Sequence, residues 1–404
     1  MAQPAVVVIG GGPAGTFAAI GARKQAPDAE VTLLTDERCE PYEKPPLSKG
    51  VLVGRVAAAD APIAGPGGLA SHGVRLEHHA TCRAIDRAAR TIELADGRSV
   101  RYTSLVIATG SVVRELTQLP VGTPRVHYLR TEADAARLKA TLGETKRLLV
   151  IGGGLIGLEV AASAAELGVA TTVLELAPRV LERVCNEEVA AIVAEEHQRH
   201  GVELRVACAL ASADVTASAI EVMTTCGDRV IADAVVVGTG ARPNDALARA
   251  AGLDVQDGIV VDEYCRTSDP HIFAAGDAVR FPGPHGAVRL ENWRHAQDQG
   301  LVAGRNAAGA AETYRTIPSF WSEQYDLYIQ GVGWPLAGAE RVARPLAGKA
   351  VLTFDVADGR VVGALGINVQ RDLAVVRRLI ERGIPIDAAA LADPTQPLSG
   401  MLKR

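Results

Sequence analysis

Residues 6–15 read VVVIGGGPAG, and this pattern predicts the fold class of the chain. A short β-branched run leads into the pattern Gly10-x-Gly12-x-x-Gly15, and the apolar residues 17–20 that follow are compatible with a helix. In a strand–turn–helix unit of the Rossmann type, the first glycine permits the tight turn. The second lets the backbone approach a pyrophosphate, and the third lets the helix pack on the strand. The helix N-terminus then presents free N–H groups to the phosphates, so the stretch predicts a dinucleotide-binding module.

The same construction recurs as LLVIGGGLIG, residues 148–157. A single glycine pattern of this kind is a weak signal, but here each copy follows a strand pattern and opens a helix pattern. Each copy also has an acidic partner, because the next expected strand ends at Asp36 and Glu37 in the first copy and at Glu175 in the second. A carboxylate at that strand end hydrogen-bonds ribose hydroxyls. The chain is therefore predicted to hold two dinucleotides and to pass electrons between them.

Three further segments fit two such modules. Residues 105–110 read as a buried strand that ends in a small-residue turn, and residues 235–240 are a near copy. Residues 267–281 contain a strand that ends at Gly276-Asp277, where Asp277 could hydrogen-bond a ribityl chain or cap a helix.

The bulk properties set limits on the function. A chain of 404 residues is long for one core, so two or three domains are expected. No apolar run reaches the roughly 18 residues of a membrane span, and no basic stretch precedes the first apolar run, so neither a span nor a signal peptide is expected. The net charge of -5 argues against a nucleic-acid partner.

The six cysteines are scattered, without C-x-x-C or metal-ligand spacing. In a chain of this length they are expected to be buried thiols rather than disulfides or ligands. This reading predicts a cytoplasmic protein without a metal site.

Several longer motifs carry a family resemblance. They are PYEKPPLSK at 41–49, YLRT at 128–131, APRVLERV at 177–184, ENW at 291–293 and FWSEQY at 320–325. Together with the two glycine loops, they resemble the FAD-dependent NADH:ferredoxin reductases of the putidaredoxin reductase-like family, which serve Rieske dioxygenases and bacterial cytochromes P450. Residues 55–70, which are rich in Ala, Gly and Pro, fit this family poorly.

The resemblance implies an α/β fold of the glutathione reductase-like kind, with two Rossmann-like dinucleotide-binding domains and a C-terminal α+β domain. The FAD-binding domain is expected at 1–112 and 242–315, the NAD-binding domain at 113–241, and the C-terminal domain at 316–404. In the last of these, residues 351–354 and 361–365 flank Asp358-Gly359, which is a hairpin signal. Residues 371–382 read as a helix that Gly383 ends.

The resemblance also implies the reaction. NADH gives a hydride to the flavin N5, and single electrons then pass to a [2Fe–2S] ferredoxin that feeds a Rieske oxygenase or a cytochrome P450. A flavin is needed because a nicotinamide gives electrons in pairs and an iron–sulfur centre takes one. In the family, the positions of Lys49 and Glu159 form an ion pair beside N5, and Trp293 and Trp321 are expected against the flavin ring. The plainer alternatives are a solvent-exposed Lys49 and Glu159, and two core tryptophans.

The remaining cofactor contacts are expected from the glycine loops and the resemblance together. On the FAD side they are Gly10, Gly12, Pro13, Ala14, Gly15, Asp36, Glu37, Lys44, Pro45, Lys49, Cys82, Ala108, Thr109, Gly110, Arg130, Gly276, Asp277, Glu291, Asn292, Trp293, Ala296 and Trp321. On the NAD(H) side they are Gly152, Gly154, Leu155, Ile156, Gly157, Glu159, Glu175, Arg183, Gly238 and Gly240.

Other flavoenzymes of this fold set two alternatives. Disulfide reductases, NADH oxidases and peroxidases use a redox cysteine beside the flavin, but residues 41–49 contain none and Cys39 precedes them. An NADH-binding flavoprotein of the apoptosis-inducing-factor kind stays open as a second reading. We expect a monomer or weak homodimer. The basic residues of the 371–382 helix are either a solvated face or a docking surface for an acidic ferredoxin.

Overall fold

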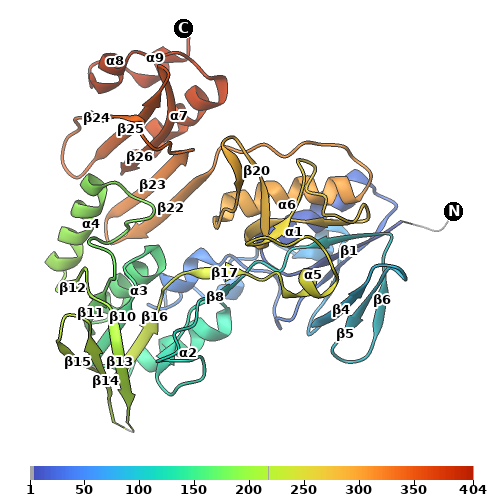
Figure 1. Cartoon of the computed structure of the whole chain (residues 1–404), viewed down its shortest axis with the longest axis horizontal. Helices are drawn as coiled ribbons and strands as arrows, with labels where there is room; N and C mark the ends of the chain where they lie inside the picture. The colour runs from blue at the N-terminus through green and yellow to red at the C-terminus, as the bar shows by residue number, and fades with distance from the viewer. Residues whose placement is uncertain (1–3, 217, 404) are drawn as a thin grey trace. The chain divides into compact units, whose positions relative to one another are not determined.

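A computed structural model describes residues 4–216 and 218–403 of the chain (Figure 1). By their contacts, the residues divide into two compact units. The first holds the described residues up to Lys44, together with Ala57–Val112 and Ala241–Thr316. The second holds Pro45–Val56, Val113–Gly240 and the described residues from Ile317 onward.

The first unit is built on a five-stranded parallel sheet of order β19-β7-β1-β2-β3. Its strands are β1 (Ala5–Ile9), β2 (Glu30–Leu34), β3 (Arg75–Glu77), β7 (Ser104–Ile107) and β19 (Ile272–Ala274). Helix α1 (Pro13–Gln25) connects β1 to β2, and helix α6 (Trp293–Ala307) packs on α1. That packing is close because glycines face backbone: a Cβ added at Gly304 would meet the carbonyl oxygen of Ala18.

Smaller elements complete this unit. Two three-stranded sheets are formed by β4 (Cys82–Asp86), β5 (Thr91–Leu94) and β6 (Ser99–Arg101), and by β18 (Ile259–Val260), β20 (Val279–Gly283) and β21 (Gly286–Val288). The short helices are α5 (Ala246–Ala250), η2 (Ala58–Asp60), η3 (Leu69–His72) and η4 (Gly276–Ala278). The strands β8 (Ser111–Val113) and β17 (Ala241–Pro243) pair where the chain leaves the first unit and returns to it.

The second unit repeats the parallel sheet, with the order β12-β11-β10-β16-β9. Its strands are β9 (Val126–His127), β10 (Arg147–Ile151), β11 (Ala170–Leu174), β12 (Glu203–Arg205) and β16 (Ala234–Val237). Its helices are α2 (Glu132–Leu142), α3 (Leu155–Glu166), α4 (Glu187–Arg199) and η1 (Pro45–Ser48). An antiparallel meander of β13 (Leu210–Val215), β14 (Ile220–Thr224) and β15 (Arg229–Ala232) belongs to the same unit.

The C-terminal part of this unit is an antiparallel sheet of order β22-β23-β26-β25-β24 with helices against it (Figure 1). It comprises β22 (Ser319–Gln324), β23 (Leu327–Gly333), β24 (Glu340–Arg344), β25 (Val351–Ala357), β26 (Arg360–Ile367), α7 (Gln370–Arg382), α8 (Ala388–Ala392) and α9 (Leu398–Met401). The predicted hairpin is confirmed: β25 pairs with β26, and both Asp358 and Gly359 adopt positive φ. The predicted helix is confirmed as α7, which Gly383 ends in the left-handed conformation.

The predicted fold class is therefore confirmed, with two parallel Rossmann-like sheets and a C-terminal α+β part. The three domain boundaries remain a prediction. The sequence did not predict that residues 45–56 would group with the second glycine loop rather than with the first.

Candidate functional site

The first glycine loop has one open position between two tightly packed ones. A Cβ at Gly10 would lie 2.2 Å from the carbonyl oxygen of Ala108, and one at Gly15 would lie 1.8 Å from that of Gly10. A Cβ at Gly12 would meet nothing within 4 Å, and no side chain caps the helix that begins there. The loop therefore leaves space at the uncapped start of α1, where the N–H groups and the helix dipole favour a pyrophosphate. Pro13 and Ala14 open the helix.

The second glycine loop repeats this arrangement. A Cβ at Gly152 would lie 2.5 Å from the carbonyl oxygen of Gly238, and one at Gly157 would lie 2.0 Å from that of Gly152. Gly154 again faces open space at the uncapped start of a helix, α3, whose first residues are Leu155 and Ile156. Both loops thus fit a dinucleotide at the carboxyl end of a central parallel strand, where such folds bind their ligands.

The acidic residues at the two strand ends differ in their contacts. Asp36 is exposed, whereas Glu37 accepts hydrogen bonds from Tyr42 at 2.6 Å and from Lys44 at 3.1 Å. Lys44 and Glu37 therefore form an ion pair.

Glu175 reaches the glycine loop of its own module. Its carboxylate accepts the N–H groups of Gly153 at 2.6 Å and Ala177 at 2.7 Å. Arg183 lies beside Gly240 of the same unit, near the end of β16. A carboxylate at this strand end suits a ribose with free hydroxyls.

A turn from the late part of the chain lies beside the first glycine loop. The N–H of Gly276 donates to the side chain of the buried Gln299 at 2.8 Å, and a Cβ at Gly276 would lie 2.7 Å from the Cβ of Ala14 and 3.7 Å from that of Ala296. Asp277, next in the chain, accepts a hydrogen bond from Ser111 at 2.9 Å. The structure thus brings Ala14, Gly276 and Ala296 together.

The start of α6 carries the predicted tryptophan of this unit. Asn292 caps the helix by accepting the N–H of His295 at 2.8 Å. Trp293 lies edge-on to Phe17 of α1, with ring centroids 6.1 Å apart. Burial raises the pKa of Glu43, and the nearby Trp293 side chain partly offsets the rise.

The other predicted FAD contacts lie on separate elements of the two units. Thr109 donates to the carbonyl of Asn244 at 2.6 Å, in the turn from Ala108 to Gly110 that follows β7. Glu291 pairs with Arg289. The backbone N–H of Arg130 donates to Asp134 at 3.1 Å at the start of α2, in the second unit.

Lys49 and Glu159 form an ion pair, with Nζ 3.2 Å from Oε2. Pro45 begins the short helix η1, and Lys49 directly follows its last residue. Glu159 lies in the first turns of α3. The Glu159 side chain is 4% exposed and the Lys49 side chain 20%. The alternative of a solvent-facing Glu159 is therefore excluded.

Two partners of this pair had not been predicted. The hydroxyl of Ser48 donates to Oε2 of Glu159, and that of Ser322 donates to Oε1 at 2.6 Å. Ser322 lies next to Trp321 on β22, and successive strand residues point to opposite faces, so the half-buried Trp321 lies on the face away from Glu159. No signal in one sequence links Ser322 to Glu159.

The cysteines correct one expectation. Cys208 and Cys226 form a disulfide, so the reading of all six as unpaired thiols was wrong for these two, which the antiparallel hairpin of β13 and β14 brings together. Cys82, Cys185 and Cys265 are free thiols.

Burial favours the protonated form of these three thiols. It raises the pKa of Cys82 and of Cys185 to about 12, and it raises that of Cys265 further. The negative charge of Asp36 adds to the effect at Cys82. These groups are not thiolates near neutral pH and cannot serve as redox nucleophiles.

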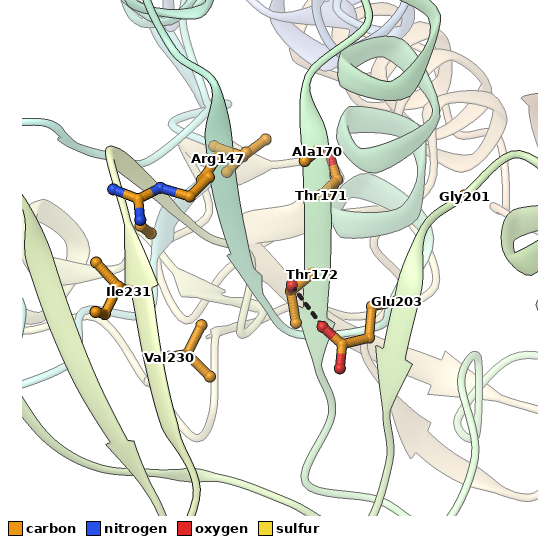
Figure 2. Close-up of a pocket in the computed structure, with 10 residues that line it drawn as sticks. Arg147, Ala170, Thr171, Thr172, Gly201, Glu203, Val230 and Ile231 are labelled. Atoms are coloured by element: carbon orange, nitrogen blue, oxygen red, sulfur yellow. Dashed lines mark hydrogen bonds between the residues drawn. The ribbon is translucent and has the colours of Figure 1, made fainter.

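A hollow of about 230 Å³ lies elsewhere in the second unit (Figure 2). It is lined by the starts of β10, β11 and β12, including Arg147, Ala170 and Glu203, and Thr172 bonds Glu203 at its wall. These are the amino ends of the parallel strands, opposite to the glycine loop, so the hollow is not the dinucleotide site. Within residues 4–216 and 218–403, no helix is long and apolar enough to cross a membrane, and no cluster of His, Cys, Asp or Glu could hold a metal ion.

Comparison with known proteins agrees with this geometry. Residues 4–300 match the family described as pyridine nucleotide-disulphide oxidoreductase, and residues 319–402 match the reductase C-terminal domain. The chain is 39% identical, over the whole of both chains, to the ferredoxin--NAD(+) reductase component of the anthranilate 1,2-dioxygenase system of Burkholderia cepacia. It is 38% identical to the corresponding component of the p-cumate 2,3-dioxygenase system of Pseudomonas putida, with 97% of each chain covered.

Among solved structures, a chain of the covalent putidaredoxin reductase–putidaredoxin complex superimposes with a TM-score of 0.93 at 32% identity. The match covers 100% of this chain and 99% of the other.

Proposed function

Because the chain belongs to the pyridine nucleotide-disulphide oxidoreductase family, and within it to the ferredoxin–NAD(+) reductases, we propose that it oxidises NADH and reduces a [2Fe–2S] ferredoxin through bound FAD. The single observation that carries this proposal is the pair of glycine loops, each with an open central glycine at an uncapped helix start, in a chain similar over its full length to such reductases. The ferredoxin serves a Rieske oxygenase or a cytochrome P450.

The first loop, with Gly276 and Asp277, would hold FAD, and the second loop with Glu175 would hold NADH. When bound, FAD supplies the exchange between a two-electron donor and a one-electron acceptor. The chain positions the two dinucleotides and excludes water. Lys49 and Glu159 are proposed to lie at the reacting edge of the ring, where Lys49 offsets developing negative charge and Glu159 keeps the ammonium in place.

The electrons are proposed to leave the protein because the segment that contains η1 offers no thiol to accept them. Residues 41–49 contain no cysteine. Burial holds Cys82 and Cys185 as thiols, since the pKa of each is raised to about 12. Neither residues 41–49 nor Cys82 and Cys185 therefore supply the thiolate that peroxide or disulfide chemistry needs, which favours transfer to a separate carrier over the oxidase alternative.

A basic stripe on α7 is the proposed docking surface for the acidic ferredoxin. Arg371, Arg378 and Arg382 are exposed, and their spacing of seven and four places them on one face of the helix, away from the buried Leu373 and Val376. Arg377 is paired with Glu381, so its charge is largely offset. A stripe of this kind speeds association by electrostatic steering, even in a chain with a net charge of -5.

We propose a cytoplasmic enzyme that works as a monomer or weak homodimer. The test of the function is an anaerobic titration of the FAD-loaded protein. NADH should bleach the flavin, and a [2Fe–2S] ferredoxin should restore its colour. A stable flavin–NAD charge-transfer complex that no ferredoxin discharges would favour a sensor of the apoptosis-inducing-factor kind.

A further inference from the structure

The Glu159 carboxylate is the end point of a chain of buried hydrogen bonds. Its Oε2 atom pairs with the ammonium of Lys49 and accepts a hydrogen bond from the hydroxyl of Ser48. Its Oε1 atom accepts a hydrogen bond from the hydroxyl of Ser322 at 2.6 Å. The chain continues through Gln324, whose Nε2 donates to the Ser322 oxygen at 3.0 Å. It then reaches His197 of α4, whose Nε2 lies 2.8 Å from Oε1 of Gln324.

The members of this chain lie in the interior of the second unit. The exposed fraction is 0% for Ser322, 2% for Gln324 and 0% for His197. Buried polar groups that lose one partner cost the full desolvation of the other, so such a network is kept only when every bond is made.

The bonds run in one direction. A carboxamide oxygen only accepts, so His197 must carry its proton on Nε2 to bond Gln324. Gln324 then donates through its nitrogen to Ser322, which leaves the Ser322 proton free to point at Glu159. Every donor thus points toward the carboxylate. The reverse direction would require a protonated Glu159 that donates to Ser322, which the ammonium of Lys49 disfavours.

We infer that Ser322, Gln324 and His197 are positioning residues for Glu159: they form a one-way hydrogen-bond chain that fixes the carboxylate in the orientation in which it pairs with Lys49. The inference rests on the proposed function in one respect, because it assigns Lys49 and Glu159 to the reacting edge of the flavin. None of the three residues is placed against a cofactor.

The surroundings of His197 favour the neutral tautomer protonated on Nε2, which the hydrogen-bond chain requires. The hydroxyl of Tyr325 lies 3.3 Å from Nδ1 of His197, and a ring protonated on Nε2 alone can accept there. Burial lowers the pKa of His197, and the hydrogen bond with Gln324 offsets only part of that lowering. The ring therefore stays neutral at physiological pH, and its tautomer is set by its two hydrogen-bond partners.

The first experiment reads that tautomer without measuring turnover. In FAD-loaded protein labelled with 15N-histidine, the NMR signals of His197 should show one neutral tautomer, protonated on Nε2. Glu159→Leu removes the acceptor at the end of the chain, so Ser322 is free to turn toward Gln324, and both tautomers should appear. An unchanged single tautomer in Glu159→Leu would overturn the link between His197 and Glu159.

The second experiment reads the orientation of Glu159 through reduction of the flavin by NADH in stopped flow. Ser322→Ala and Gln324→Leu should slow the reduction step about tenfold, since small misplacements of a positioned group carry costs of this order. The Kd for NADH should stay near that of the wild type, because neither residue is placed at the nucleotide.

Thr353→Val is the matched control. Thr353 is buried and accepts a hydrogen bond from Asn186 at 2.9 Å, again between the region of α4 and the C-terminal sheet, but this bond has no link to Glu159. If Ser322→Ala and Gln324→Leu slow flavin reduction no more than this control, the hydrogen-bond chain is merely structural and the inference fails. Should Gln324→Leu not fold, Ser322→Ala deletes a single atom and carries the test.

The two failures can be told apart. A wild-type protein that NADH does not reduce would refute the proposed function, while the tautomer of His197 would still test the chain. A wild-type protein that NADH reduces, with chain variants that match the control, would refute only the inference.

Discussion

Lys49 Nζ lies 3.2 Å from Oε2 of Glu159, and this contact joins the short helix η1 to the second glycine-loop helix. The two partners are unequally buried, because the Glu159 side chain is 4% exposed and that of Lys49 is 20% exposed. Loss of the lysine leaves a buried carboxylate, whereas loss of the carboxylate leaves an ammonium that can turn toward water.

The loss of folding stability should be larger when Lys49 is replaced than when Glu159 is replaced, because the two side chains are unequally buried. Lys49→Met should lower the free energy of unfolding by about 2–3 kcal/mol, because Ser48 and Ser322 only partly compensate the stranded charge. Glu159→Gln keeps one acceptor oxygen for a serine hydroxyl and strands no buried negative charge, so it should cost less. Urea unfolding of the two variants measures the difference, and equal losses would mean that the carboxylate is better solvated than its burial indicates.

Substitutions at the two open glycines, Gly12 and Gly154, should affect the binding of different cofactors. Gly12 and Gly154 have φ near -80° and face open space, so alanine is tolerated at each position in the folded protein. Gly12→Ala should therefore reduce bound FAD, and Gly154→Ala should keep FAD but weaken NADH binding, each by roughly tenfold or more where a methyl group displaces a phosphate contact.

The flavin absorbance of the purified protein and the Kd for NADH are the measurements. Loss of FAD in Gly154→Ala, or unaltered affinities in both variants, would contradict the assignment of the loops.

Glu175 should make the enzyme select NADH. Its carboxylate is held against the glycine loop by the N–H groups of Gly153 and Ala177, and it would face a 2′-phosphate as a like charge. A mismatch of this kind costs several kcal/mol, on the order of a hundredfold in kcat/KM. Glu175→Gln should narrow the ratio between NADH and NADPH. A wild-type enzyme that uses both coenzymes equally would show that Arg183 or another cation offsets the charge.

The fold could be read from the sequence where a local pattern was repeated. The strand, glycine turn and helix of residues 6–20 and of 148–162 are short-range features, so both sheets and both helix starts were predicted. The hairpin at Asp358-Gly359 was predicted for the same reason, since both turn residues need positive φ.

The supporting contacts of the site could not be read in this way. Ser322 and Gln324 meet Glu159 and His197 only through the packing of β22 near α3 and α4, and serine and glutamine in a strand look like surface residues in one sequence. The Cys208–Cys226 disulfide was missed because its two partners are joined by a hairpin, without a spacing motif.

The basic stripe of α7 should govern ferredoxin reduction. Replacing Arg378 and Arg382 together with glutamate should lower kcat/KM for the ferredoxin about tenfold at low salt and flatten its salt dependence. Reduction of ferricyanide by NADH needs no docking and should not change. Arg229→Gln, at an exposed arginine of β15 that pairs with Glu221, is the control. Equal effects of the two variants would mean that the stripe is a solvated face.

Electrons are proposed to enter in pairs from NADH and to leave singly to a [2Fe–2S] ferredoxin. This is tested by an anaerobic titration in which limiting NADH is added to excess ferredoxin and a catalytic amount of the FAD-loaded protein, and the absorbance of the iron–sulfur cluster is followed. About two clusters should be reduced for each NADH consumed, as the electron count requires. An enzyme whose flavin is bleached by NADH, but which reduces no [2Fe–2S] ferredoxin in a broad panel, would contradict it.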